Sequence, residues 1–282
     1  YAGAAPVFAD IDAQTYCIDS AQIRFNVTSR TRGLIPVHFT GQPCDMGSIK
    51  AIAEEHRLIV IEDAAHAIGA SYELYGQTHK VGSCAHSDMT IFSFHPVKHM
   101  TTGEGGMITT NNPDLYEQLC LLRTHGITKD LCKLTRNDGP WCYEQQELGF
   151  NYRITDIQCA LGLSQLNRLD SFVARRRQIA ESYSSAFSAC DELIVPEQAP
   201  AAHASWHLYV QGLSSLERRM VFGAMRERGL GVNVHYIPVH LQPYYQEKFG
   251  VNTGDFPKAE AHCQRSITLP LFPALSDEDL HG

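Results

Sequence analysis

The sequence lacks the features that mark several classes of protein. It has no uninterrupted apolar stretch of membrane-spanning length, and no signal peptide opens the chain. It also has no basic run and no interleaved stripe of basic and aromatic residues. Its 23 Lys and Arg residues stand against 31 Asp and Glu residues, for a formal charge of −8. We therefore expect a protein with neither a membrane nor a nucleic-acid partner.

The cysteines lack the Cys-x-x-Cys spacing expected of a zinc or redox site. Nine cysteines are scattered singly along the chain: Cys17, Cys44, Cys84, Cys120, Cys132, Cys142, Cys159, Cys190 and Cys263. An odd number without pairing favours reduced thiols, so we expect a cytoplasmic protein without a bound metal.

What is present is the pattern of an α/β protein. Up to about residue 190, short apolar runs alternate with helical patterns, which is typical of a mostly parallel sheet with helices on both faces. We expect strands at residues 5–9, 33–38, 58–62, 89–94 and 106–110. We expect helices at residues 46–56, with Asp45 as N-cap, from Pro113 to near Gly126, and at residues 155–187, where Arg175–Arg177 should form an exposed face.

A second, smaller domain is expected after this region. Residues 191–198, followed by Pro200, mark a boundary. Beyond it, an expected strand at 207–210, a helix at 215–228 and a strand at 231–235 indicate a small α+β domain. The chain would thus divide into a large domain of residues 1–190 and a small domain of residues 191–282.

A carboxylate follows the strand expected at residues 58–62. Asp63 would lie at the carboxyl edge of the parallel sheet, which is where such folds bind ligands. An Asp in this place is more often a helix cap than a catalytic group, so the surrounding residues must decide between these two roles.

The deciding residue is Lys98, in the loop after the strand expected at residues 89–94. A single loop lysine is usually a solvated surface charge. Together, however, Asp63 and Lys98 are what pyridoxal 5'-phosphate (PLP) chemistry requires. The amine condenses with the cofactor aldehyde, and the carboxylate keeps the pyridine nitrogen protonated.

These residues lie in blocks that resemble the DegT/DnrJ/EryC1/StrS family of sugar aminotransferases. The matching blocks are residues 37–46, 62–66, 93–106, 148–158 and 269–273. The resemblance implies PLP fold type I, a large PLP-binding domain and transfer of an amino group from L-glutamate to a nucleotide-linked keto-sugar. It also implies a homodimer with shared active sites.

The resemblance assigns cofactor roles position by position. Lys98 would hold PLP as a Schiff base and shuttle a proton, and Asp63 would pair with the pyridinium nitrogen. His66 would lie against the cofactor near its phenolic oxygen, although a structural histidine is an equal alternative. Ser93 would donate its hydroxyl to the cofactor phosphate, and Asn151 would reach the phosphate in the neighbouring subunit.

Substrate contacts are expected from two further segments. Tyr236 and His240 match a family segment near the sugar nucleotide. Arg153 could bind a carboxylate or phosphate through its planar fork, with an ordinary ion pair as the alternative.

Two blocks favour one branch of the family. The first, residues 95–98 with 101–106, and the second, residues 124–130, most resemble the aminotransferase of pseudaminic acid synthesis, which makes UDP-4-amino-4,6-dideoxy-N-acetyl-β-L-altrosamine from the 4-keto sugar. Relatives that aminate GDP- or dTDP-linked sugars at C3 or C4 share the cofactor residues and stay as alternatives. A dehydratase on the same scaffold would carry histidine in place of Lys98, and a non-catalytic fragment is the other alternative.

The resemblance is incomplete at the two ends. Ahead of the position of Tyr1, family members carry a small-residue turn that cradles the cofactor phosphate and an aromatic residue that stacks on its ring. At the other end, residues 280–282 stop in what looks like a helix start. We therefore expect truncation at both ends and PLP binding weaker than that of a complete family member.

Overall fold

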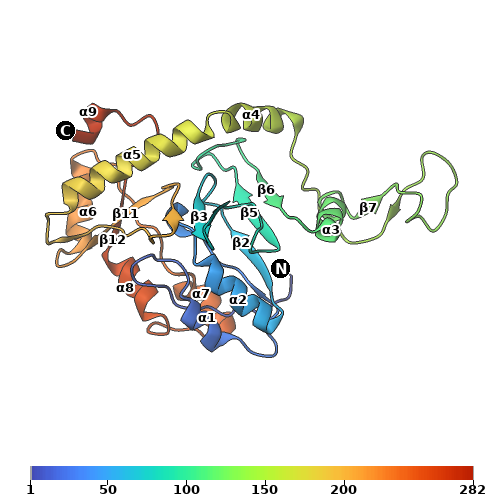
Figure 1. Ribbon diagram of the computed structural model, residues 1–282, viewed down its shortest axis with the longest axis horizontal. Helices are drawn as coiled ribbons and strands as arrows, with labels where there is room; N and C mark the ends of the chain where they lie inside the picture. Colours follow the sequence, from blue (N-terminus) through green and yellow to red (C-terminus); the bar gives the residue numbers. More distant parts are fainter. Residues whose placement is uncertain (1, 282) are drawn as a thin grey trace.

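The central sheet has the α/β order that the sequence predicts. The computed structural model describes residues 2–281 (Figure 1), so Tyr1 and Gly282, the outer limits of the two expected domains, lie outside the described residues. The strand order is β1-β2-β5-β6, and β1 (Gly33–Leu34), β2 (Ile59–Asp63) and β5 (Met89–Ser93) are parallel. Strand β6 (Gly106–Thr109) is antiparallel to β5, because the chain returns through a loop and not through a helix.

Helix α2 (Met46–His56) covers one face of this sheet. Asp45 caps it by accepting a hydrogen bond from the backbone N–H of Ser48 at 3.1 Å, as predicted. The apolar stripe of the helix packs in one cluster with strand residues Val60 and Phe92. Side chains on the opposite face of the strands, including Ile59 and Ile91, are exposed. Alternation along each strand thus separates a buried face from an exposed one.

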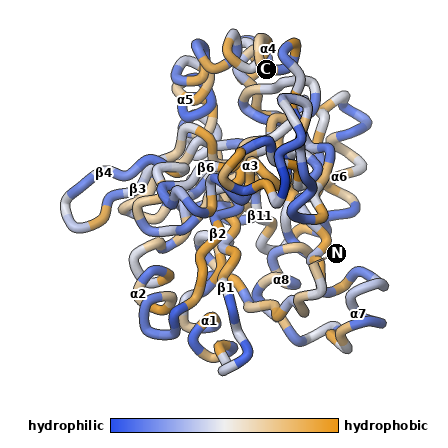
Figure 2. Tube along the Cα trace, turned by 90° about the vertical axis from the view of Figure 1, so that its right-hand side faces the viewer, coloured by the Kyte–Doolittle hydropathy of each residue, from blue (hydrophilic) through white to orange (hydrophobic). Residues whose placement is uncertain are grey.

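Several short elements surround this layer. Helix α1 (Ser20–Asn26) and the 3-10 turn η1 (Phe39–Gly41) precede α2, and β3 (Ser71–Leu74) forms a hairpin with β4 (Gln77–Lys80). The hairpin projects from the body (Figure 2) and pairs with β10 (Ala202–His203). The strand expected at residues 5–9 is wrong: that segment forms no strand, because no partner strand among residues 2–281 pairs with it.

A separate arm extends from the sheet (Figure 1). It consists of α3 (Pro113–Arg123) and the pair β7 (Ile127–Thr128) and β8 (Glu144–Gln145). Asn112 caps α3, and the predicted stop at Gly126 is confirmed. Gly126 has φ +69°, and a Cβ there would approach the carbonyl oxygen of Glu147 closely, so the turn requires glycine.

The helix expected at residues 155–187 is two helices. Helix α4 (Asp156–Leu166) begins with a capping box between Thr155 and Gln158, and α5 (Leu169–Phe187) follows after a turn at Asn167. The apolar spacing is helical on both sides of the turn, so it does not reveal the break.

The exposed arginine face expected on α5 is only partly present, because Arg177 is exposed whereas Arg175 is half-buried and Arg176 is buried. Arg176 is only 5% exposed and donates to the carbonyl oxygens of Trp206, His207 and Leu271. Arg175 binds Asp277, and Arg177 binds the carbonyl oxygen of Ala204. These arginines fasten α5 to later segments because the guanidinium offers several donors to backbone carbonyls.

The C-terminal part has its own sheet, in the order β12-β11-β9. Its elements are β9 (Leu193–Ile194), β11 (Tyr209–Leu213), α6 (Arg218–Glu227), η2 (Val239–Leu241), α7 (Pro243–Phe249), α8 (Pro257–Arg265), β12 (Ser266–Leu269) and α9 (Asp277–His281). The strand expected at 231–235 is reduced to a single bridge between Asn233 and Thr268. The second core joins Tyr209 and Ile267 to Ile179 of α5. The domain boundary at residue 190 stays a prediction.

Two structural facts concern the expectations based on apolar stretches and cysteines. In residues 2–281, no helix combines the length and the apolar character needed to cross a bilayer. All nine cysteines are free thiols.

Candidate active site

Asp63 ends β2 at the carboxyl edge of the sheet. Its backbone N–H donates to the carbonyl oxygen of Pro36 at 2.9 Å, and its own carbonyl oxygen accepts from the N–H of His38 at 3.0 Å. The Oδ1 atom accepts from the N–H of Ala65 at 3.0 Å. One carboxylate oxygen is therefore held by the chain, and the structure gives Oδ2 no bond within the described part of the chain.

Lys98 lies in the loop that links β5 to β6. The loop is folded back on Phe94, whose carbonyl oxygen accepts from the N–H of Thr102 and the hydroxyl of Thr101, both at 3.0 Å. Lys98 is half-buried, and burial lowers the pKa of its amine, while the carboxylate of Asp63 opposes part of this shift. The structure thus brings Lys98 and Asp63 within electrostatic reach of each other.

A cluster of buried histidines, with rings tilted against one another, lies beside Lys98. The ring of His66 is 4.4 Å from that of His207, which is 5.3 Å from that of His99. Burial, reinforced by the charge of Lys98, lowers the pKa of His66 to about 3, and burial lowers the pKa of His99 to about 3 as well. These imidazoles are neutral near pH 7, and the Nδ1 atoms of all three have no hydrogen-bond partner within residues 2–281.

Ser93 and Tyr236 also reach this region. Ser93 ends β5, beside the strand that ends in Asp63, and its hydroxyl oxygen accepts a long bond from the N–H of His95 at 3.4 Å. Tyr236 is 47% exposed, and its ring is 6.2 Å from those of His66 and Phe39. Ser93 thus ends the strand next to that of Asp63, and Tyr236 lies beside His66.

Three other expected residues lie in different surroundings. Asn151 and Arg153 are exposed on the segment between the arm and α4, where Asn151 bridges to Thr124. His240 is 4% exposed and is bonded through Nε2 to Glu260 at 2.9 Å. Neither Asn151 nor Arg153 forms a side-chain hydrogen bond inside residues 2–281, and the imidazole of His240 already has a carboxylate partner.

Sequence reasoning missed Phe39, His99 and His207, which all contact the site region. The signal for His207 is a histidine inside the apolar run of residues 206–210, where an unpaired polar side chain is costly. No comparable signal marks His99, because its partner, the carbonyl oxygen of Ser205 at 2.9 Å, is distant in sequence.

An amine and a carboxylate close to the carboxyl edge of a mostly parallel sheet are the arrangement that the sequence predicts for a PLP-dependent aminotransferase. A model of the DegT/DnrJ/EryC1/StrS aminotransferase family matches residues 1–282. The spore coat polysaccharide biosynthesis protein SpsC of Bacillus subtilis is 41% identical over 285 residues, covering 99% of this chain and 72% of SpsC. The chain therefore belongs to the DegT/DnrJ/EryC1/StrS family, a family of PLP-dependent sugar aminotransferases.

Solved structures agree on the fold. Spr1654 of Streptococcus pneumoniae, in its PLP form, has a TM-score of 0.88 at 32% identity, covering 99% of this chain and 73% of that one. PseC of Helicobacter pylori, an aminotransferase involved in the biosynthesis of pseudoaminic acid, has a TM-score of 0.88 at 28% identity, covering 99% and 71%. The identity to SpsC is higher than that to PseC, so similarity establishes the family and leaves the expected subfamily open.

Proposed function

We propose that this protein is a PLP-dependent aminotransferase in which Lys98 holds the cofactor and Asp63 binds its ring nitrogen. The observation that carries this proposal is a half-buried amine in the loop after β5 that lies within electrostatic reach of the carboxylate at the end of the neighbouring strand β2. Family membership supports the cofactor, because the related Spr1654 has been solved in a PLP form.

The residues present fit PLP. The lowered pKa of Lys98, caused by burial, favours the neutral amine that can react with an aldehyde. Asp63 has one oxygen held by Ala65 and one available for a cationic ring nitrogen. The Ser93 hydroxyl suits a phosphate oxygen, and the unpartnered Nδ1 of His66 is a buried polar atom that a cofactor group could satisfy.

The roles of these residues follow from their chemistry. When bound, PLP supplies an electron sink for the carbon that gains or loses the amino group. Nζ of Lys98 would condense with the cofactor aldehyde with loss of water and, once released, would carry a proton between the amine-bearing carbon of the substrate and the former aldehyde carbon. Asp63 would keep the ring nitrogen charged, and the buried histidines beside Lys98 would add no positive charge next to it.

For the substrate, we propose a nucleotide-linked 4-keto-6-deoxy sugar that receives its amino group from L-glutamate. The family includes sugar aminotransferases, and the resemblance of residues 95–98 with 101–106 and of residues 124–130 favours a UDP-linked sugar of pseudaminic acid biosynthesis. GDP- and dTDP-linked keto-sugars, aminated at C3 or C4, are the alternatives that the experiment must separate. Tyr236 is the substrate contact that its position beside His66 supports best.

We also propose a homodimer in which Asn151 acts on the cofactor of the neighbouring subunit. The segment that carries Asn151 exposes large apolar side chains that a monomer would leave in water. Leu148 is 89% exposed, Ile157 is 84% exposed and Leu163 is 66% exposed. A concentration of exposed apolar side chains of this size is typical of an interface.

Borohydride reduction tests the cofactor proposal. Purified protein incubated with PLP should show a visible absorption band that borohydride abolishes, and peptide mapping should find the reduced cofactor on Lys98. The matched control is Lys98→Arg, which keeps a positive charge but cannot condense with an aldehyde. Labelling of another lysine in the unsubstituted protein, or no label at all, would contradict the assignment and favour a non-catalytic relative.

A panel of acceptors tests the substrate proposal. UDP-, GDP- and dTDP-linked 4-keto and 3-keto sugars are supplied with L-glutamate, and amino-sugar products are identified by mass spectrometry and NMR. We expect the UDP-linked 4-keto sugar to be aminated with the highest kcat/KM. Preference for another nucleotide would move the protein to a different branch of the family without affecting the cofactor assignment.

A further inference from the structure

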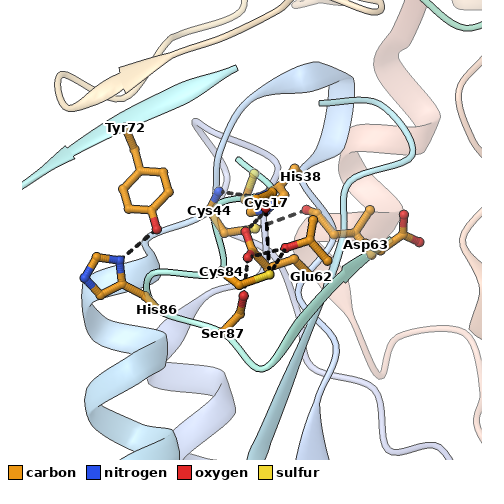
Figure 3. A network of polar contacts seen from close by, with 12 residues as sticks. Cys17, His38, Cys44, Glu62, Asp63, Tyr72, Cys84, His86 and Ser87 are labelled. Atoms are coloured by element: carbon orange, nitrogen blue, oxygen red, sulfur yellow. Dashed lines mark hydrogen bonds and ion pairs between the residues drawn. The ribbon is translucent and has the colours of Figure 1, made fainter. Parts of the chain in front are cut away.

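A buried polar network lies directly behind Asp63, on the other face of β2 (Figure 3). Glu62, the residue before Asp63, is 2% exposed, and its Oε2 atom is 2.7 Å from Nε2 of His38, which is fully buried. Its Oε1 atom accepts from the hydroxyl of Thr90 at 2.7 Å and from the hydroxyl of Ser87. The carboxylate is thus enclosed by three donors.

The hydrogen bonds define the state of the His38 ring. Its Nδ1 atom accepts from the backbone N–H of Cys44 at 3.0 Å, so the ring proton is on Nε2 and is donated to Glu62. Burial raises the pKa of Glu62, but the hydrogen bonds that its carboxylate accepts outweigh burial and bring the pKa below its usual value. The pair is therefore a neutral imidazole bound to a charged carboxylate.

His38 also holds the main chain of Asp63. Its backbone N–H donates to the carbonyl oxygen of Asp63 at 3.0 Å, in the parallel bridge that pairs Val37 with Asp63. The side chain of His38 is meanwhile fixed to Glu62 on one side and to Cys44 on the other. One residue thus connects the network behind the sheet to the backbone of the carboxylate in front of it.

The same segment reaches the site itself. Phe39 follows His38, and its ring is 6.1 Å from that of His66. Thr40 comes next, and its carbonyl oxygen accepts from the N–H of His207 at 2.7 Å. His38 and the two residues after it thus contact both Asp63 and the buried histidines.

We propose that the buried pair of His38 and Glu62 positions Asp63 against the cofactor ring nitrogen. This inference rests on the proposed function and adds two positioning residues that touch neither cofactor nor substrate. Figure 3 shows the geometry: the side chain of Asp63 points away from the network, while Glu62 and His38 meet on the opposite side. The pair acts through the backbone and leaves the Asp63 carboxylate free.

Two substitutions of His38 separate positioning from packing. The amide of His38→Gln extends as far as Nε2 and can still donate to Glu62. The amide of His38→Asn reaches only the position of Nδ1. It can therefore accept from the backbone N–H of Cys44 but cannot donate a hydrogen bond to Glu62. Both remove an imidazole, and both will lower stability. Only His38→Asn removes the hydrogen bond to Glu62, which the proposal requires.

Three measurements compare the two variants. With saturating PLP, kcat for the glutamate reaction should be about tenfold or more lower in His38→Asn than in His38→Gln, with KM for glutamate within about twofold. The nitrogen-15 chemical shift of ring-labelled PLP should move toward the unprotonated value in the Asn variant alone. Crystal structures of both variants without PLP should show Asp63 displaced only in His38→Asn.

Equal Asp63 positions and equal nitrogen shifts in the two variants would overturn the proposal. If His38→Asn does not fold, Glu62→Gln removes the negative charge that Nε2 of His38 binds with little loss of packing, and an unchanged Asp63 position and nitrogen shift in that variant would also overturn it. If the unsubstituted protein binds no PLP, the proposed function fails, and the crystal structures alone still decide whether His38 positions Asp63.

Discussion

Burial sets the protonation of the histidines around Lys98. Burial lowers the pKa of His66 and His99 to about 3 and that of His262 to about 4, whereas an unfolded histidine titrates near pH 6.5. Below pH 6.5 the unfolded chain therefore binds protons that the folded chain does not, which favours unfolding. As the pH falls below 6.5, each such histidine should reduce the free energy of unfolding by about 1.4 kcal/mol for each pH unit.

We predict that stability falls steeply from pH 6.5 to about pH 4.5, above the range in which most carboxylates titrate. Urea unfolding at a series of pH values measures this slope. His99→Gln should keep the donor to the carbonyl oxygen of Ser205 and reduce the slope by about one proton. A stability that does not change over this interval would show that these histidines take up protons without unfolding.

Asp63 offers a second prediction at the residue scale. Asp63→Asn keeps the acceptor for the N–H of Ala65 but removes the negative charge. The glutamate reaction should slow by about tenfold or more, equivalent to at least about 1.4 kcal/mol, with the melting temperature almost unchanged. Stopped-flow absorbance measures the rate, with Asp45→Asn, a distant N-cap of α2, as a control that changes charge elsewhere. A smaller effect would assign Asp63 a structural role.

Residue patterns predict only part of this site. Asp63 and Lys98 each follow an apolar strand, and parallel strands place their carboxyl ends together, so both could be predicted from sequence. The contacts of His207 with His66 and with His99 could not, because they join segments that are far apart in the chain. The pairing of His38 with Glu62 depends on tertiary structure in the same way.

Helix α8 has an N-terminus that another part of the chain caps. Its preceding residue, Phe256, provides no side-chain hydrogen bond. Instead the buried Asp10 accepts from the backbone N–H groups of Lys258 and Ala259, both at 3.0 Å. The carboxylate satisfies two donors that the helix itself leaves open, and its charge complements the helix dipole.

We predict that Asp10→Ala lowers the free energy of unfolding by about 1–2 kcal/mol. Asp10→Asn should lower the free energy of unfolding by less, because its remaining oxygen can still accept from the backbone N–H of Ala259. Urea unfolding of the three proteins at pH 7.5 gives the comparison. Equal midpoints for all three would mean that water replaces the cap without loss.

Helix ends that are marked by a nearby cap or glycine could be predicted from the sequence. Elements that depend on pairing with a distant segment could not. The capped apolar stripe of α2 predicts its bounds, as does Gly126 for the end of α3. The break between α4 and α5 has no such signal, because Asn167 and Arg168 are compatible with a helix. The apolar residues 5–9 fit a strand, yet a strand exists only where another one pairs with it.

At the scale of the whole molecule, the proposed dimer predicts complementation between inactive variants. If Asn151 acts in the neighbouring site, a heterodimer of Asn151→Ala and Lys98→Ala has one intact site and one doubly damaged site. An equal mixture after full subunit exchange should recover about a quarter of the unsubstituted activity. Activity assays with mass measurement of the exchanged dimers check this. No recovery despite exchange would place Asn151 in its own subunit's site.

The cap of α8 by Asp10 has a consequence for biosynthesis. The partners of Asp10, at Lys258 and Ala259, are synthesised 248 and 249 residues after it. At a synthesis rate of about 5–20 residues per second, the nascent chain waits roughly 12–50 s before this contact can form. During that interval the segment around Asp10 is open to chaperones and proteases, because the helix N-terminus that it caps does not yet exist.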